Sequence, residues 1–314
     1  MRLWNSVKRG LRRFYSAWEA YINAAVKFLL SCLTLWGILL LTGSHPLLGQ
    51  PAAVVLVAAA CSILPANALI LAAAVYLEAG FWQSSMTSGL VGGVLLLVAL
   101  LFYFCFISGQ AFVVVCTGLS LGLGLPFCVP VACGLMRGPG SVVGISLGTA
   151  VYFVSSRLIG AGGETQALGE EMLDSVLELF GTVCLDREML MTLVILSVVC
   201  LVVYLIRRMP IPHCWMLGTG AGALVYGIFR GMELLLIGAV SLPLLAADLL
   251  LGIGTGLMLN GFCFALDYRK VQYLQFEDDE YYYYVKAVPK LDPLTEDGAE
   301  DPENPAVRTK KEMT

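Results

Sequence analysis

The chain has 314 residues, 58% of them hydrophobic and only 13% charged, and its mean hydropathy is +0.81. Soluble domains carry about 25% charged residues, so this composition excludes an ordinary soluble protein. It predicts an all-α integral membrane protein, a polytopic bundle of about six to eight transmembrane helices with two proline-broken segments. The net charge of −4 lies mostly at the end of the chain, where residues 267–314 hold 12 acidic and 7 basic residues.

Basic residues precede the first apolar segment. Residues 1–22 contain five lysines and arginines interleaved with aromatic and aliphatic side chains, a pattern typical of an amphipathic helix on the membrane surface. The apolar run from Ala24 to Leu41 is long for a signal peptide and lacks a convincing cleavage signature, so it predicts a retained first span. The positive-inside rule then places the N-terminus in the cytoplasm.

Two consecutive units share one layout. Residues 51–107 and residues 111–160 each begin with an apolar segment broken at a Leu-Pro pair and continue into an uninterrupted span. The first break contains Pro65, and the second contains Pro126 and Pro130. In lipid, the N–H and C=O groups freed by a break must be covered by protein or by a water-filled cavity. Both breaks therefore predict a binding site.

Two topologies satisfy this layout. If each broken segment crosses the membrane once, the transmembrane domain at residues 23–268 has about eight crossings, and the two units are parallel repeats. If each is a re-entrant hairpin that folds at Pro65 or at Pro126 to Pro130, about six crossings remain and the units are inverted. In the inverted case we expect the two breaks to face each other near the membrane midplane, with a ligand between them.

Charged segments predict the sidedness. Residues 161–188 are acidic and carry apolar residues at helical spacing, which predicts an amphipathic helix in an outer loop. Arg207 and Arg208 end a later span, and Arg269 and Lys270 follow the last one, so both pairs predict cytoplasmic exits. We therefore expect a cell-membrane protein with both termini in the cytoplasm, with the lipid bilayer as a partner and no nucleic acid.

The C-terminal tail has two parts. Residues 269–290 are rich in tyrosine and have high strand preference, whereas residues 291–314 are polar, acidic and proline-containing, which predicts disorder. The first part either docks a cytoplasmic protein by adding a strand or folds back on its own membrane domain. The candidate partner-binding residues are Phe276, Tyr281, Tyr282, Tyr283 and Tyr284.

Three segments, DYRKVQYLQFEDDEYYYYVKAVPK, VVYLIRRMPI and LPFCVPVACGLM, resemble an uncharacterised family of clostridial multi-pass membrane proteins, sometimes labelled transporter permeases. FEDDEYYYYVKAVPK, which starts at Phe276, is the most specific of these motifs. The resemblance implies a Gram-positive cytoplasmic membrane. A weaker likeness relates LPFCVPVACGLMRGPGSVVGISLGTAVYF to the substrate-binding subunits of energy-coupling-factor vitamin transporters.

Ionisable residues inside membrane segments are candidates for solute contact. Glu78 ends the first broken segment, where topology anchoring is the alternative role. Asp248 lies in an apolar run, where capping the N-terminus of its own span is the alternative. Arg230 and Glu233 are three positions apart and predict a local ion pair. Together with the breaks, the candidate cavity residues are Pro65, Asn67, Glu78, Pro126, Pro130, Asp248 and Asn260.

No enzyme constellation accompanies these candidates. The only histidines are His45 and His213, and the sequence contains no P-loop, HExxH or GxSxG motif, so we predict no catalysis, cofactor or metal. The leading hypothesis is a permease-type protein that moves a small solute with a separate cytoplasmic partner. The alternative is a non-transporting scaffold that recruits envelope or division machinery through its tail. Convergence of the polar candidates on one cavity favours transport, whereas a closed, dry bundle favours the scaffold.

Overall fold

The computed structural model describes residues 2–43, 49–161, 180–181, 186–209, 213–237, 242–263, 272–277 and 282–287. The chain divides into two units, Met1–Phe262 and Cys263–Thr314, which are described separately. The larger unit is a helical bundle, which confirms the predicted all-α polytopic fold.

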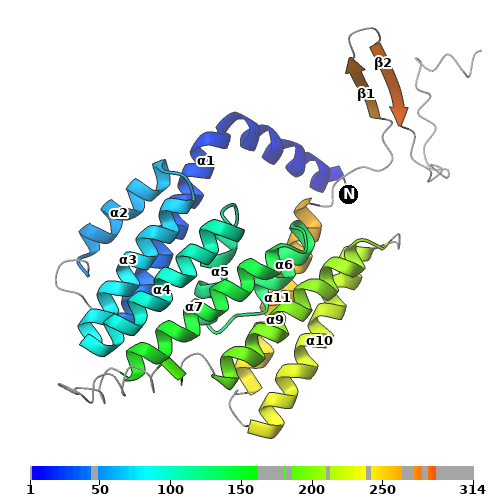
Figure 1. Cartoon of the computed structure of the whole chain (residues 1–314). Helices are drawn as coiled ribbons and strands as arrows, with labels where there is room; N and C mark the ends of the chain where they lie inside the picture. The colour runs from blue at the N-terminus through cyan, green and yellow to red at the C-terminus, as the bar shows by residue number, and fades with distance from the viewer. Residues whose placement is uncertain are drawn as a thin grey trace, which may run out of the picture. The chain divides into compact units, whose positions relative to one another are not determined.

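The helices of the larger unit are α1 (Arg2–Thr42), α2 (Pro51–Ile63), α3 (Asn67–Ser84), α4 (Met86–Phe106), α5 (Ala111–Gly122), α6 (Cys128–Met136), α7 (Ser141–Ala161), α9 (Arg187–Arg207), α10 (Cys214–Ile237) and α11 (Leu242–Cys263) (Figure 1). In the described part of the chain, five segments are long and apolar enough to cross a membrane: Tyr21–Thr42, Met86–Phe106, Ser141–Gly160, Arg187–Arg207 and Leu242–Gly261. Their exposed side chains include many large apolar residues, as expected of surfaces that contact lipid. The chain is therefore a multi-pass membrane protein.

The basic lead-in and the first span form one bent helix, α1. Trp18 has non-helical backbone angles (φ −120°, ψ 21°) and separates the first part of α1 from the span Tyr21–Thr42. Figure 1 shows the bend. The bend lies where the basic sequence gives way to the apolar one, as expected for an amphipathic lead-in joined to a span.

Helices α5 and α6 form a re-entrant hairpin. Gln110, just before α5, contacts Gly144 in the first turn of α7. α6 ends at Met136, and the carbonyl of Arg137 accepts a hydrogen bond from Arg207 at the end of α9 (3.3 Å). Since α7 begins five residues after α6 ends, both feet of the hairpin lie at one end of the bundle. We call it the arginine end.

The hairpin reaches about halfway through the bilayer. α5 has 12 residues and α6 has 9. At about 1.5 Å of rise per residue, these arms are about 18 and 14 Å long, against a hydrocarbon core of about 30 Å. The turn between them contains Gly124 with φ of +72°, a conformation that glycine adopts without steric cost.

Helices α2 and α3 form a second hairpin beside α1. The Ser62 hydroxyl, at the end of α2, donates to the carbonyl of Ala24 near the start of the first span (2.8 Å). α3 then runs parallel to α1, because Gly80 near its end contacts Thr42 at the end of α1. The chain therefore reverses at Pro65, between the two arms.

The two hairpins enter from opposite ends of the bundle. The turn after Pro65 lies at the arginine end, because the Tyr103 hydroxyl donates both to Asn67 Oδ1 (2.7 Å) and to the carbonyl of Ser108, just before α5 (3.2 Å). The two units are therefore inverted, as in the second alternative, but only the α5–α6 hairpin stops partway, because the α2–α3 hairpin reaches the opposite end of the bundle.

One expectation attached to that alternative is wrong. The two breaks do not face each other at the midplane. Pro65 is exposed at the arginine end, whereas Pro126 is buried about halfway through the bundle. The physical reason is the unequal depth of the hairpins, since α3 has 18 residues and α5 only 12.

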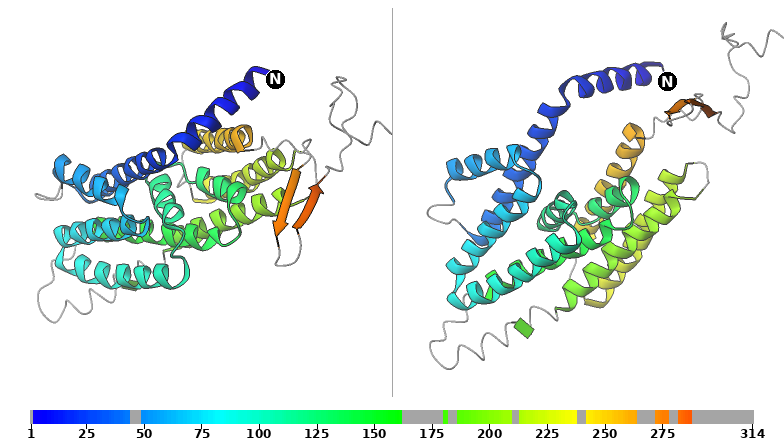
Figure 2. Two further views of the ribbon diagram at one scale, coloured as in Figure 1. Left: turned by 90° about the horizontal axis from the view of Figure 1, so that it is seen from above. Right: turned by 45° about the horizontal axis from the view of Figure 1, so that its top comes forward.

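Helices α9, α10 and α11 alternate in direction, and α9 and α10 lie side by side (Figure 2). Small residues allow close approach: Gly222 of α10 packs against Val203 of α9, and Gly252 of α11 lies against the ring of Phe127. A side chain at either glycine would overlap its neighbour. The glycine-rich segments of α10 and α11 thus include packing faces, as is common between membrane helices.

The smaller unit contains an antiparallel hairpin of β1 (Gln272–Glu277) and β2 (Tyr282–Ala287). Phe276 pairs with Tyr283 in its register. The predicted strand preference of the tyrosine run is therefore confirmed from Tyr282 onward. Tyr281, the predicted disordered residues 291–314 and most of the acidic loop at 161–188 lie outside the described residues.

Candidate functional site

The break between α5 and α6 is closed by a carboxylate from another helix. Asp248 Oδ1 accepts the backbone N–H of Phe127, the residue that precedes α6, over 3.1 Å. Asp248 is the seventh residue of α11, so it does not cap its own helix; it caps α6 instead. The backbone N–H that the break frees at Phe127 is therefore hydrogen-bonded within the protein and is not left for a ligand.

Tyr226 of α10 completes this arrangement. Its hydroxyl donates to Asp248 Oδ2 over 2.5 Å, and its ring stacks on Phe127 with centroids 4.8 Å apart. Tyr226 and Asp248 are each 2% exposed, and Phe127 is fully buried. We call Phe127, Tyr226 and Asp248 the cap cluster. Both carboxylate oxygens of Asp248 accept hydrogen bonds, so the buried cluster joins α6, α10 and α11.

An ion pair lies beside the cap cluster. The Arg230 guanidinium lies 6.0 Å from the centre of the Tyr226 ring and donates to Glu233 Oε2 over 2.6 Å. Arg230 also reaches the Thr192 hydroxyl on α9, at 3.5 Å. The predicted local pair is therefore confirmed, and its side chains are only 15% and 14% exposed. Because both side chains are largely buried, each charge compensates the other, and neither is an unpaired charge inside the bundle.

The other candidate cavity residues do not converge on the cap cluster. Asn67 is bound to Tyr103, and Pro65 is exposed. Glu78 Oε1 accepts the indole N–H of Trp82 over 2.8 Å, while its buried Oε2 has no hydrogen-bond partner among the described residues. Asn260 lies twelve positions beyond Asp248 on α11, about 18 Å further along the helix. The convergence that would favour transport is therefore not seen among the described residues: Asp248 contacts the α6 break beside Pro126 and Pro130, and the other candidates lie apart.

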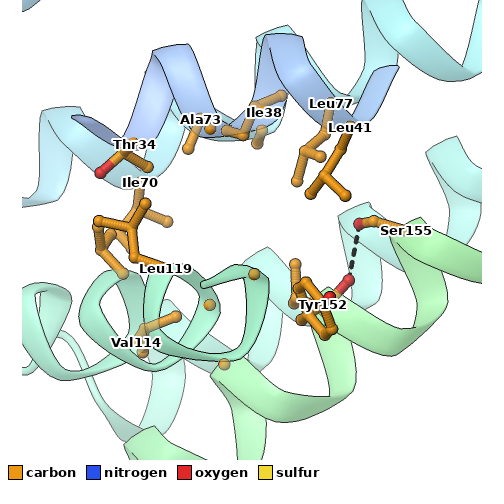
Figure 3. Close-up of a pocket in the computed structure, with 18 of the residues that line it drawn as sticks. Thr34, Ile38, Leu41, Ile70, Ala73, Leu77, Val114, Leu119, Tyr152 and Ser155 are labelled. Carbon is orange, nitrogen blue, oxygen red and sulfur yellow. Dashed lines mark hydrogen bonds between the residues drawn. The ribbon is translucent and has the colours of Figure 1, made fainter. Parts of the chain in front are cut away.

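A cavity of about 360 Å³ lies elsewhere, between α1, α3, α4, α5 and α7. Its walls are almost entirely apolar, with Ile38 of α1, Ile70 and Leu77 of α3 and Leu119 of α5 pointing into the space (Figure 3). Gly118 and Gly122 line the wall formed by α5. We call this space the lateral cavity.

The polar groups of the lateral cavity are few and mostly occupied. The Thr34 and Ser155 hydroxyls donate to carbonyls of their own helices, Leu30 at 2.6 Å and Val151 at 2.6 Å (Figure 3 shows the second bond). Tyr152 also lines the cavity, and within the described residues its hydroxyl makes no hydrogen bond. The cavity thus offers one uncommitted polar group in an apolar wall.

The lateral cavity opens toward the lipid-facing surface. Its lining includes Leu33, Trp36 and Leu40 of α1 and Leu123 of α5, which are 61%, 51%, 75% and 72% exposed. In a membrane these exposed apolar side chains contact acyl chains, so the rim lies in the bilayer. Access from the lipid phase does not require a path through water.

Sequence reasoning missed both Tyr226 and the lateral cavity. Tyr226 lies in a glycine-rich packing segment, where nothing distinguishes a tyrosine that binds a carboxylate from one that fills space. Gly118 and Gly122 of α5 line the cavity together with residues of α1, α3, α4 and α7. Those glycines were visible in the sequence, but their partners were not.

No protein-family model, curated protein or solved structure matches the chain. The resemblances to the clostridial membrane family and to energy-coupling-factor subunits therefore remain predictions. The functional conclusion depends on the geometry described above.

Proposed function

We propose that the chain is a permease-type membrane protein that binds a small, largely apolar solute in the lateral cavity and moves it together with a separate cytoplasmic partner. The observation that carries this proposal is the apolar cavity of about 360 Å³ beside the re-entrant arm α5. Ligand sites commonly occupy about 300–1,000 Å³. Apolar cavities of about 150 Å³ already hold benzene.

The distribution of polar groups supports an apolar solute over a polar one. The cap cluster is closed, and Asn67 is bound to Tyr103, so neither offers free groups to a sugar or an ion. The lateral cavity has the Tyr152 hydroxyl as its uncommitted polar group. A hydrocarbon body with one hydroxyl or carbonyl matches such a lining, because each buried polar group of the solute then has a partner.

The hairpin supplies a wall that is able to move. α5 ends halfway through the bilayer and continues into a turn rather than into a further helix. The cap cluster fixes the far side of that turn through Phe127. A shift of α5 against α1 and α7 changes the opening of the lateral cavity without unfolding a full span, which is the kind of local rearrangement that transport requires.

Gly118→Leu provides the direct test. Gly118 lines the cavity, and a Cβ there meets no atom within 4 Å, so leucine fills the space without overlapping a neighbour. The full-length protein is reconstituted in nanodiscs with a diazirine-bearing fatty alcohol, irradiated and mapped by mass spectrometry. We expect labels on α5 and α7 in the unmodified chain and none there in Gly118→Leu.

Gly220→Leu on α10 is the matched control, because Gly220 is exposed and also has no atom within 4 Å of an added Cβ. Both changes replace a helical glycine with leucine and raise helix propensity by a similar amount. Equal labelling of α5 in the two variants would contradict the proposal. Flux of the fatty alcohol across proteoliposomes, lost in Gly118→Leu alone, separates transport from binding.

A scaffold role is the second candidate, and two observations favour it: the separate β1–β2 hairpin, and the polar candidate residues that do not converge on one cavity. Tyr283→Pro removes a backbone N–H from β2 and constrains its φ, so it disrupts the hairpin without touching the bundle. Loss of co-purifying proteins in Tyr283→Pro, with fatty-alcohol labelling and flux absent in the unmodified chain, would support the scaffold instead.

A further inference from the structure

A second pocket, of about 500 Å³, lies at the arginine end of the bundle. It is formed by the end of α6 and the last turn of α9, and its lining residues are Met136, Arg137, Gly138, Tyr204, Arg207 and Arg208. The hairpin geometry creates it, because α6 returns to the same end at which α9 finishes. Three guanidinium groups from two helices therefore surround one space.

Few of their donors are occupied by groups of the described residues. Arg207 Nη1 donates to the Arg137 carbonyl at 3.3 Å and its guanidinium stacks 5.3 Å from the centre of the Trp215 ring. Arg208 Nη1 reaches the Tyr204 hydroxyl at 3.5 Å. Each guanidinium has five N–H donors, so most of their fifteen or so donors have no partner in the described part of the chain.

Among the described residues, no carboxylate pairs with the arginines of this pocket. Throughout the described residues, none lies within 4.0 Å of the guanidinium nitrogens of Arg137, Arg207 or Arg208. Arg157 and Arg230 of the same bundle do have carboxylates, at 2.7 and 2.6 Å. Three like charges around one space repel each other, and an anion bound between them removes that repulsion.

The surface beside the pocket is suited to acyl chains. Leu201 and Leu205 of α9 and Arg208, the residue directly after α9, follow one another at i, i+4 and i+7; because Arg208 keeps helical backbone angles, the three share one face. Leu205 is 56% exposed, and Met136 at the rim of the pocket is 55% exposed. A phosphate held by Arg208 places its attached hydrocarbon along Leu205 and Leu201, whereas a free phosphate gains nothing from that stripe.

We infer that the pocket formed by Arg137, Tyr204, Arg207 and Arg208 binds the phosphate of an anionic phospholipid headgroup. Guanidinium groups match the fork geometry of phosphate oxygens, and the tyrosine hydroxyl adds a further donor. Basic pockets between helix ends are a recurrent form of lipid recognition. The site shares no lining residue with the lateral cavity, so lipid binding there does not depend on the proposed solute.

The test is lipid binding to the full-length protein, measured by native mass spectrometry with phosphatidylglycerol and with phosphatidylcholine. The double variant Arg137→Gln/Arg208→Gln removes two exposed charges from the pocket. We expect it to weaken phosphatidylglycerol binding by about tenfold or more, since each lost charged hydrogen bond contributes at least that much. Phosphatidylcholine binding should be weaker than phosphatidylglycerol binding from the start and change little.

Arg187→Gln is the matched control, because Arg187 is an exposed arginine at the opposite end of the same helix. It should bind phosphatidylglycerol like the unmodified chain. Equal phosphatidylglycerol binding by the double variant and by Arg187→Gln would overturn the inference. Stabilisation against heat by inorganic phosphate alone, equal to that by phosphatidylglycerol, would also overturn it and identify a soluble-phosphate site.

Discussion

Asp248 accepts a hydrogen bond from the backbone N–H of Phe127, 121 positions earlier in the chain, over 3.1 Å. Through this bond α11 anchors the turn of the re-entrant hairpin and supplies the acceptor for the N–H that the break between α5 and α6 frees. A buried acidic residue that the sequence suggests as a solute contact is thus first a helix cap, supplied by a different helix.

Replacing Asp248 with alanine should destabilise the bundle strongly. The change leaves two buried donors, the Phe127 N–H and the Tyr226 hydroxyl, without acceptors. Each unsatisfied buried donor costs about 1–3 kcal/mol. The free energy of unfolding, measured by SDS titration in mixed micelles, should fall accordingly.

Asp248→Asn is the control for this cap. Asparagine keeps one carbonyl oxygen for the Phe127 N–H, so its loss of stability should be smaller than that of Asp248→Ala. Tyr226→Phe removes only the second bond. Additive effects of Asp248→Ala and Tyr226→Phe in a double-mutant cycle would show that the two residues do not act together.

Gly252→Leu should separate α11 from the hairpin. A side chain at Gly252 overlaps the ring of the fully buried Phe127, and the surrounding helices leave that ring little room to shift. Overpacking of this kind costs about 1–3 kcal/mol. At Gly254, two residues further on, an added Cβ meets no atom within 4 Å, so Gly254→Leu should retain the unmodified stability. Identical melting of the two variants would argue against the contact between α11 and Phe127.

Removing one partner of the Arg230–Glu233 pair should be more harmful than removing both. Glu233→Gln leaves the enclosed Arg230 charge without its carboxylate, at a cost of roughly 3 kcal/mol. Arg230→Met/Glu233→Met replaces both charges with apolar side chains of similar length and should recover much of that stability. Unfolding in mixed micelles compares the two variants directly, and a less stable double variant would refute this account of the pair.

The class of fold was predictable because it follows from local properties of the sequence. Apolar length identifies the spans, and the proline-glycine breaks at Pro65 and Pro126 identify the two hairpins. The choice between crossing and re-entry was not predictable. It depends on which helix each break packs against, as in the contact of Gln110 with Gly144, and such long-range pairs leave no periodic signal in one sequence.

The candidate site was predictable only in part. The α6 break and Asp248 were both recognised, but the sequence does not show that one satisfies the other, because their contact joins residues 121 positions apart. Asn67 was likewise recognised as a candidate, but the sequence did not identify Tyr103, whose hydroxyl donates a hydrogen bond to it. The lateral cavity is defined by what five helices leave unfilled, and no single segment encodes such a space.

The re-entrant hairpin is the central claim, since the cap cluster, the lateral cavity and the arginine pocket all depend on it. Single cysteines at Gly109, Gly138 and Gly160 test it in sealed vesicles with a membrane-impermeant maleimide. All three positions are exposed, and an added Cβ meets no atom within 4 Å at any of them. We predict that Gly109→Cys and Gly138→Cys react from the same side and Gly160→Cys from the other. Reaction of Gly109→Cys and Gly138→Cys from opposite sides would mean that α5 and α6 cross the membrane together, and would contradict the account.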